Sequence, residues 1–382
     1  MLASRALGIV SPLAATIAER IRTYGPITFA EYMDACLYHP ELGYYTKPEQ
    51  QPRRDYFTSV DAGPLFGKLL ARQFHEMWTL LGRPAEFLLI EAGAGGGALT
   101  AQILDFVARE FPQFYGALRY IAVERSAARR RLIAEVQSLR SQVGGGKFEI
   151  ASEIPAEIAC GCIFSNELFD AMPVHRVVRE GTELRELYVT LGPNGVGECV
   201  GPLSSVALRE YFSDQAITLE DGQQAEANLS ACEWIQDAGT RLQRGFVLTI
   251  DYGHEAGELY DHRHMRGTLL AYQRHRAGED FFRAPGEQDL TAHVNFTALD
   301  HWGKRAGLAR TGLASQSTFL MALARQSDFA ELQSEGMSEG DRTRARLLFK
   351  TLIYPEGMGE TFQVFVQHKN VESPRLTGLE PL

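Results

Sequence analysis

The sequence has few cysteines, no long apolar run and no excess of basic residues. Its five cysteines include no CxxC pair, which predicts reduced thiols in a cytosol-like compartment. No apolar run approaches the ~18 residues of a membrane span. A net charge of −10 disfavours binding to nucleic acid. These absences leave a soluble globular protein with no nucleic-acid partner and no membrane span.

The N-terminus lacks the features of a targeting segment. Arg5 is not followed by an apolar core and a cleavage site. The helix predicted next carries Glu19 and Arg20, and an acidic residue is atypical of organelle transit peptides. We therefore expect a bacterial cytoplasmic protein, or one of the mitochondrial matrix if the source is eukaryotic.

The chain of 382 residues is too long for one ordinary core. Residues 1–83 predict a helical N-terminal cap: an amphipathic helix over 12–25, a second started by the capping box Thr28 to Glu31, and a third opened by Pro64.

Residues 84–372 alternate short apolar runs with helical segments, which predicts an α/β domain with a mostly parallel sheet. Insertions at about 174–243 and 254–300 interrupt this alternation. The first begins as an antiparallel hairpin, and the second is long enough to be a lid. Residues 373–382 are expected to form a tail.

The stretch from Phe87 to Gly97 carries the strongest signal. Its apolar start predicts a buried parallel strand, which ends at Glu91. Gly93, Gly95 and Gly97 then predict a tight turn whose bare backbone approaches a ligand, before a helix begins at residue 98. Strand, turn and helix together predict a Rossmann-like nucleotide-binding unit.

The acidic residues beside this turn bear on its ligand. The pattern also satisfies GxGxxA, a dinucleotide fingerprint, but a pyrophosphate would meet the charge of Glu91. S-adenosylmethionine (SAM) has no phosphate, and its ammonium and sulfonium favour a carboxylate. Glu124, after the second predicted strand, suits the ribose hydroxyls of either ligand. Glu91 has the alternative role of capping its own turn.

Polar residues follow the fourth predicted strand. Asn166, Glu167 and Asp170 would lie at the carboxyl edge of the sheet, where reactive groups gather in parallel sheets. A carboxylate pair there could bind a guanidinium and orient its nitrogen toward a methyl donor. The alternative is a helix N-terminus, with Asn166 as the cap and Glu167 in the first turn.

The fifth predicted strand ends with Asp251 and His254 at the same edge. His254 could act as a general base, or it could be a structural hydrogen-bonding group. Asp251 is the other candidate to take up a departing proton. His262, His264 and Asp261 form an incomplete ligand set, so we expect no metal.

Ordered motifs over most of the chain resemble the MidA-like class I SAM-dependent methyltransferases. The motifs are Ile27–Met33, His39–Tyr45, Asp55–Ser59, Leu65–Gly67, Glu91–Gly97, Ser165–His175, Ile250–His254, Gly267–Leu269, Tyr272, His275–Arg276 and Pro285–Val294 with Phe296.

The resemblance implies a class I methyltransferase sheet with a helical cap and an inserted lid. Mitochondrial members are protein arginine methyltransferases that assist assembly of respiratory complex I, so it also implies arginine methylation of a protein. By similarity, Glu91, Gly93, Gly95, Glu124 and the Asn166–Glu167 edge would face SAM or the methyl acceptor. Tyr45, Thr58 and Ser59 would close over the cofactor.

The chain departs from the family pattern at a few positions. Ala94 stands where the family usually has proline, Asn295 where it has aspartate, and Val60–Gly63 where a proline and an acid are usual.

Two other functions fit parts of the sequence. An NAD(P)-dependent oxidoreductase would use the same Gly-rich turn. A non-catalytic assembly chaperone would keep the SAM fold and grip a partner, and the presence of both Glu91 and Glu124 argues against it.

Overall fold

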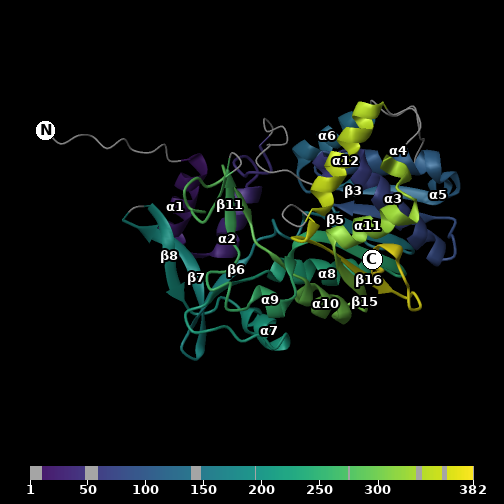
Figure 1. The fold of residues 1–382 in the computed structure, drawn as a ribbon. Helices are drawn as coiled ribbons and strands as arrows, with labels where there is room; N and C mark the ends of the chain where they lie inside the picture. Colours follow the sequence, from purple (N-terminus) through teal and green to yellow (C-terminus); the bar gives the residue numbers. More distant parts are fainter. Residues whose placement is uncertain are drawn as a thin grey trace. The chain divides into compact units, whose positions relative to one another are not determined.

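The computed structural model describes residues 11–47, 59–138, 148–193, 195–273, 276–332, 338–354 and 359–381. The chain divides into two units, whose helices and strands are shown in Figure 1. The first unit comprises Met1–Tyr56, Asp170–Ala231 and Glu255–His293. The second comprises Phe57–Phe169, Cys232–His254 and Val294–Leu382.

The second unit contains an eight-stranded sheet in the order β15-β16-β10-β5-β2-β3-β4, with β14 paired to β10. Neighbours from β10 to β4 run parallel, and β16 is antiparallel to both of its neighbours. The strands are β2 (Phe87–Ala92), β3 (Leu118–Val123), β4 (Phe148–Ala151), β5 (Gly161–Asn166), β10 (Gly245–His254), β14 (Val294–Asn295), β15 (Ala309–Ser315) and β16 (Phe362–Lys369). The predicted α/β class with a mostly parallel sheet is confirmed.

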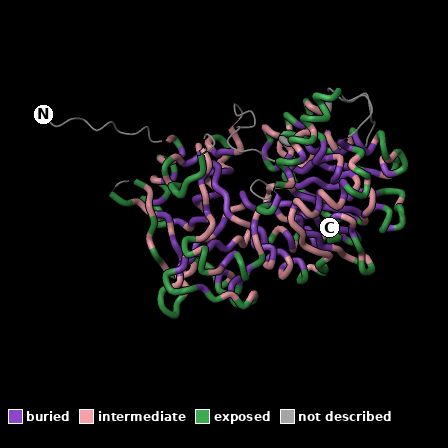
Figure 2. Tube along the Cα trace, in the orientation of Figure 1, coloured by how far each residue is buried: buried purple, intermediate pink, exposed green. Residues whose placement is uncertain are grey.

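Helices lie between and after the strands of this sheet in the sequence. They are α3 (Pro64–Leu80), α4 (Ala98–Glu110), α5 (Pro112–Ala117), α6 (Ala127–Ser138), α8 (Leu229–Arg241), α10 (Phe296–Arg305), α11 (Gln316–Gln326) and α12 (Glu339–Ile353), with 3-10 turns η1 (Ser59–Ala62), η2 (Ala330–Leu332) and η4 (Thr377–Leu379). Figure 2 shows the buried stretches of chain between the more exposed outer helices.

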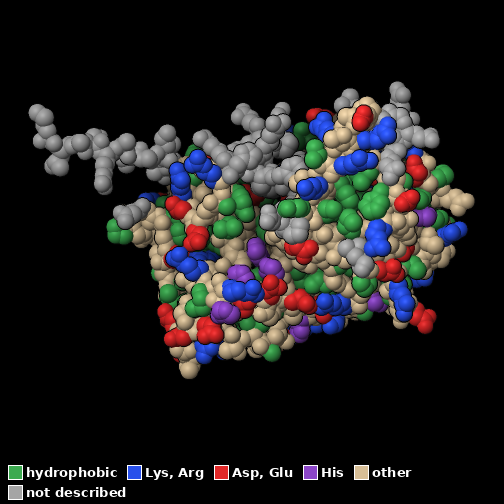
Figure 3. Space-filling model, viewed as in Figure 1, with side chains coloured by type: hydrophobic (Ala, Val, Ile, Leu, Met, Phe, Trp, Pro, Cys, Tyr) green, Lys and Arg blue, Asp and Glu red, His purple; other side chains and the backbone are tan. Residues whose placement is uncertain are grey.

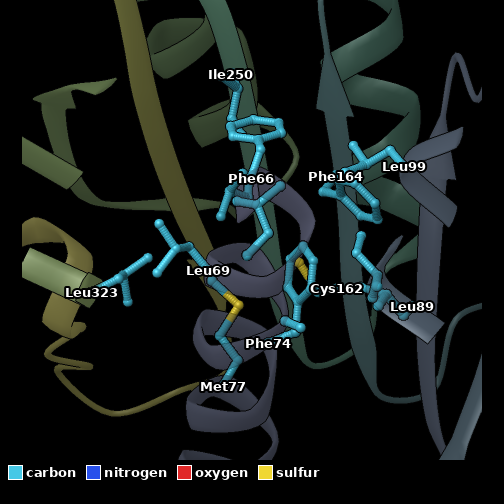
Figure 4. Packing of buried hydrophobic residues seen from close by; sticks show 14 of the residues in the cluster. Phe66, Leu69, Phe74, Met77, Leu89, Leu99, Cys162, Phe164, Ile250 and Leu323 are labelled. Atoms are coloured by element: carbon cyan, nitrogen blue, oxygen red, sulfur yellow. The ribbon is translucent and has the colours of Figure 1, made fainter. Parts of the chain in front are cut away.

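The core of the second unit explains why α3 belongs to it. Phe66 and Phe74 of α3 are fully buried and belong to one hydrophobic cluster with Leu89 and Phe164 of the strands (Figure 4). The aromatic rings of Phe74 and Phe164 lie 4.8 Å apart, centroid to centroid. Burying such a helical face stabilises the fold by about 25 cal/mol per Å² of apolar surface. The third predicted helix is thus part of the sheet unit, and the boundary expected at residue 83 differs from the observed one.

The C-terminal residues belong to the second unit and pack against α3. Leu376 is buried, and the backbone N–H of Thr377 donates to the Glu76 carboxylate of α3. Residues 373–381 therefore do not form the separate tail that the sequence predicted.

The first unit combines the N-terminal helices with both insertions. Its elements are α1 (Pro12–Tyr24), β1 (Ile27–Thr28), α2 (Phe29–Tyr38), β6 (His175–Glu180), β7 (Glu183–Gly192), β8 (Gly195–Gly201), α7 (Val206–Asp214), β9 (Gln224–Ala227), α9 (Ala256–Leu259), β11 (Leu270–Gln273), β12 (Arg276–Gly278) and β13 (Asp289–Thr291). Strands β6, β7 and β8 pair antiparallel, which confirms the predicted hairpin. Phe29, Val189 and Leu290 share one core, so all three stretches of this unit fold together.

Charged side chains of both signs are interspersed on the face seen in Figure 3. Within the described ranges, no helix is both long and apolar enough to cross a membrane. The same residues contain no group of three or more His, Cys, Asp or Glu placed to hold a metal ion.

Candidate active site

A Gly-rich turn joins β2 to α4 in the second unit. Gly93, Gly95 and Gly97 have φ values of +77°, +56° and +77°, which other residues rarely adopt. A Cβ on Gly93 would lie 3.1 Å from the Leu168 side chain, whereas one on Gly95 would have no neighbour closer than 4.0 Å. The backbone at Gly95 is thus open to a ligand. Helix α4 follows Gly97 with no side-chain cap.

Glu91 lies at the end of β2 and is 4% exposed. Its Oε2 accepts hydrogen bonds from the hydroxyls of Thr100, at 2.5 Å, and Tyr120. None of the residues in the described ranges donates to Oε1. Burial raises the pKa of the Glu91 carboxyl to about 7, and the charge of Glu124 adds to the rise, whereas the two hydroxyls oppose it.

Glu124 directly follows β3, the neighbour of β2. Its Oε2 accepts from the backbone N–H of Gly95 at 3.0 Å, and its Oε1 accepts from that of Ser126 at 2.8 Å. The carboxylate therefore fixes the open part of the Gly-rich turn. It brings a second buried acid to the turn, as the sequence predicted.

Glu167 follows β5 in a left-handed conformation, with φ +54°. Such a conformation is uncommon outside glycine and clusters at functional sites. Its Oε1 accepts from Asn166 Nδ2 at 3.0 Å and from the backbone N–H of Ser59 at 3.3 Å. No helix begins between residue 166 and β6 at residue 175, so the alternative N-cap interpretation is wrong.

Two buried polar atoms beside Glu167 have no hydrogen-bond partner within the described part of the chain. They are Asn166 Oδ1 and Ser165 Oγ. Leaving such an atom unsatisfied costs about 1–3 kcal/mol, so unpaired buried groups in a native protein call for a ligand or water.

Asp251 of β10 is fully buried. Its Oδ2 accepts from the backbone N–H groups of Leu168 and Phe169 at 3.1 and 2.9 Å, and its Oδ1 accepts from that of Tyr252 at 3.0 Å. Asp251 thus holds the turn that carries Glu167, a positioning role that differs from the predicted proton transfer.

Replacing Asp251 with alanine is expected to lower the free energy of unfolding by about 3 kcal/mol, because three backbone N–H groups, one of them the buried N–H of Phe169, lose a charged acceptor. Urea denaturation followed by circular dichroism measures this change. Asp237→Ala serves as the control, since the Asp237 side chain is 47% exposed and pairs with Arg241 on the surface of α8. An Asp251→Ala protein as stable as this control would contradict the positioning role.

His254 is the last residue of β10 and pairs with Asn295 of β14. Asn295 caps α10 by accepting from the backbone N–H of Ala298 at 3.0 Å. Aspartate and asparagine are equally good caps, so the family's aspartate and this asparagine serve the same local structure.

The remaining predicted cofactor contacts are Tyr45, Thr58 and Ser59. Ser59 is buried in η1 and joins the edge through Glu167. Tyr45 belongs to the first unit, where its hydroxyl donates to Asp289 Oδ1 at 2.7 Å. Thr58 lies outside the described residues. Sequence reasoning missed Thr100 and Tyr120, although Tyr120 is the one polar side chain among the buried residues of β3.

Comparisons with known proteins identify the family. Residues 69–314 match the family described as "Putative S-adenosyl-L-methionine-dependent methyltransferase". The chain belongs to this family. The match extends from within α3 to within β15 and includes the Gly-rich turn and the ends of β5 and β10.

Individual proteins are similar to this chain over nearly its whole length. The human protein arginine methyltransferase NDUFAF7, mitochondrial, is 27% identical over 96% of this chain and 86% of its own length. The zebrafish (Danio rerio) protein of the same name is 29% identical over 91% and 85%. A Burkholderia thailandensis protein, solved with S-adenosyl-homocysteine bound, has a TM-score of 0.85 and 28% identity, over 96% of this chain and 94% of that one.

These comparisons decide between the two ligands that the Gly-rich turn allowed. The protein is a class I SAM-dependent methyltransferase, and SAM is its cofactor. The residues present fit SAM, because the buried carboxylate of Glu91 has one oxygen without a donor among the described residues, beside an open backbone at Gly95. A carboxylate so placed suits a cationic ligand.

Proposed function

We propose that this protein transfers the methyl group of SAM to an arginine side chain of a protein substrate. The observation that carries the proposal is the pair of acceptor groups at the end of β5, the Glu167 carboxylate and the unsatisfied Asn166 Oδ1. A guanidinium is planar and offers only donors, so it complements two neighbouring acceptor oxygens. The relatives named as protein arginine methyltransferases support the same acceptor.

In this proposal the cofactor lies at the Gly-rich turn. SAM supplies an electrophilic methyl group on a cationic sulfur. Glu91 attracts the cationic part of the cofactor, Glu124 accepts hydrogen bonds from ribose hydroxyls, and the backbone at Gly93, Gly95 and Gly97 allows close approach.

Glu167 acts on the methyl acceptor. Its carboxylate binds the guanidinium and orients the lone pair of one nitrogen toward the methyl group that SAM would supply. When the methyl group moves to nitrogen, the carbon–sulfur bonding pair would stay on sulfur. The acceptor nitrogen then loses a proton, which we assign to His254 because Asp251 already accepts three backbone hydrogen bonds.

The identity of the substrate protein follows from the family resemblance and not from the residues of the site. The family resemblance favours a subunit or assembly intermediate of a respiratory complex I type enzyme. Closure of residues 254–300 as a lid, and contacts of Tyr45, Thr58 and Ser59 with the cofactor, stay predictions, as does a cytoplasmic location in a bacterium.

Quantitative mass spectrometry of arginine-methylated peptides tests the proposed acceptor. Cells with the gene, without it, and complemented with a Glu91→Gln variant are compared. We expect at least one arginine site to be methylated only with the wild-type gene. An identical set of methylarginines in all three strains would refute the arginine proposal and leave SAM binding untouched.

A further inference from the structure

The hydroxyls of Tyr120 and Thr100 converge on one oxygen of Glu91 from different elements. Tyr120 comes from β3 and Thr100 from α4, and both side chains are fully buried. Both donate to Oε2, and neither donates to Oε1. This one-sided arrangement fixes the rotation of the carboxylate and leaves a defined oxygen for the cofactor.

Packing alone does not require a hydroxyl on residue 120. The ring of Tyr120 lies among apolar groups, 6.1 Å from that of Phe148 and 6.4 Å from that of Phe164, centroid to centroid. A phenylalanine ring would bury the same apolar area, whereas a buried hydroxyl is costly unless it is hydrogen-bonded. The hydroxyl therefore has a use that is specific to Glu91.

We propose that Tyr120, aided by Thr100, is a positioning residue for cofactor binding: its hydroxyl favours the carboxylate form of Glu91 and turns the other carboxylate oxygen toward the cationic part of SAM. This inference rests on SAM binding at the Gly-rich turn. It is independent of which molecule accepts the methyl group.

The charges around Glu91 make the hydroxyls necessary. Burial raises the pKa of Glu91, and the like charge of Glu124, after β3, raises it further. Strand β5 places Phe164 opposite Glu91, which adds apolar surroundings. The hydroxyls of Tyr120 and Thr100 lower the pKa again, because they stabilise the carboxylate form.

The sign of the pH effect follows. Without the Tyr120 hydroxyl, the pKa of Glu91 rises further above 7, and a larger fraction of the carboxyl is protonated at neutral pH. A neutral carboxyl does not attract a cation, so SAM binding weakens most at low pH and recovers as the pH rises through the higher pKa.

Calorimetric titration with SAM at pH 6 to 9 tests the proposal on Tyr120→Phe. The readout is the ratio of the variant's Kd to that of the wild type at each pH, in which the titration of the ligand itself cancels. We expect this ratio to be about 10 at pH 6 and to fall close to about 1 by pH 9. Tyr211→Phe, which removes a buried hydroxyl bonded to Tyr260 in the first unit, is the control and should keep a ratio near 1.

A double-mutant cycle separates this role from a structural one. In Glu91→Gln, which cannot ionise, adding Tyr120→Phe should change SAM affinity by less than about twofold at any pH. Thr100→Val should lose SAM affinity with the same pH dependence as Tyr120→Phe, whereas Thr100→Ser should bind SAM as tightly as the wild type. These variants keep the test valid if the Tyr120→Phe protein folds poorly.

A loss of affinity that is equal at every pH, or equal with and without Glu91, would overturn the proposal. No methyl acceptor is present in these titrations. A wrong arginine assignment therefore leaves their outcome unchanged.

Discussion

Glu91→Gln is expected to weaken SAM binding by about 30-fold or more at pH 8. Removing one member of a buried charge pair costs about 2–5 kcal/mol, and 1.4 kcal/mol corresponds to tenfold in affinity. Glutamine keeps the size of glutamate and can still accept the hydroxyls of Thr100 and Tyr120, so the change isolates the charge. Isothermal titration calorimetry measures the two dissociation constants.

A glutamate elsewhere in the same sheet provides the control for this substitution. Glu149 of β4 is half-exposed and pairs with Arg119 on the surface, so Glu149→Gln should leave SAM affinity within about twofold of wild type. A Glu91→Gln protein that binds SAM as tightly as the Glu149→Gln protein would show that Glu91 does not hold the cofactor.

Glu167→Gln is expected to lower the rate of methyl transfer by about 100- to 1,000-fold, while SAM affinity stays within about threefold. A misoriented acceptor loses much of the benefit of proximity, and a lost charge-assisted contact in a closed site costs about 3–4 kcal/mol. The carboxylate of Glu167 is anchored by Ser59 and Asn166, and these contacts place it at the end of β5. Single-turnover transfer from radiolabelled SAM to the substrate protein gives the rate.

The matched control for Glu167→Gln is Glu180→Gln, at the exposed end of β6. Its transfer rate should equal that of the wild type. Two results would show that Glu167 does not orient the acceptor. One is a Glu167→Gln transfer rate equal to that of the wild type, and the other is a fall in SAM affinity as large as the fall in the transfer rate.

The structure could be predicted from the sequence where local patterns determine the backbone conformation. The apolar run before Glu91, the three glycines and the helix from residue 98 appear as β2, the Gly-rich turn and α4. The capping box of Thr28 and Glu31 is also present, with the N–H of Glu31 donating to the Thr28 hydroxyl at 3.1 Å. In both cases the residues that decide the conformation lie within a few positions of each other.

The structure could not be predicted from the sequence where segments far apart in the chain pack together. Nothing local to Phe29, Val189 or Leu290 indicates that they share a core, because three separate stretches contribute them. The hydroxyl of Tyr120 reaches Glu91 across neighbouring strands, which only the register of β2 and β3 determines. Leu376 lies in a segment rich in turn-forming residues, and its burial depends on contacts with the rest of the second unit.

The central claim is that this protein methylates arginine with SAM, and analysis of the labelled amino acid tests it most directly. Purified protein is incubated with radiolabelled SAM and a lysate of cells that lack the gene, and the labelled proteins are hydrolysed to amino acids. The account predicts that the label appears as methylarginine, and that Glu167→Gln abolishes it while Glu180→Gln does not. Label on lysine, glutamine or a small molecule, or no transfer by a protein that binds SAM, would contradict it.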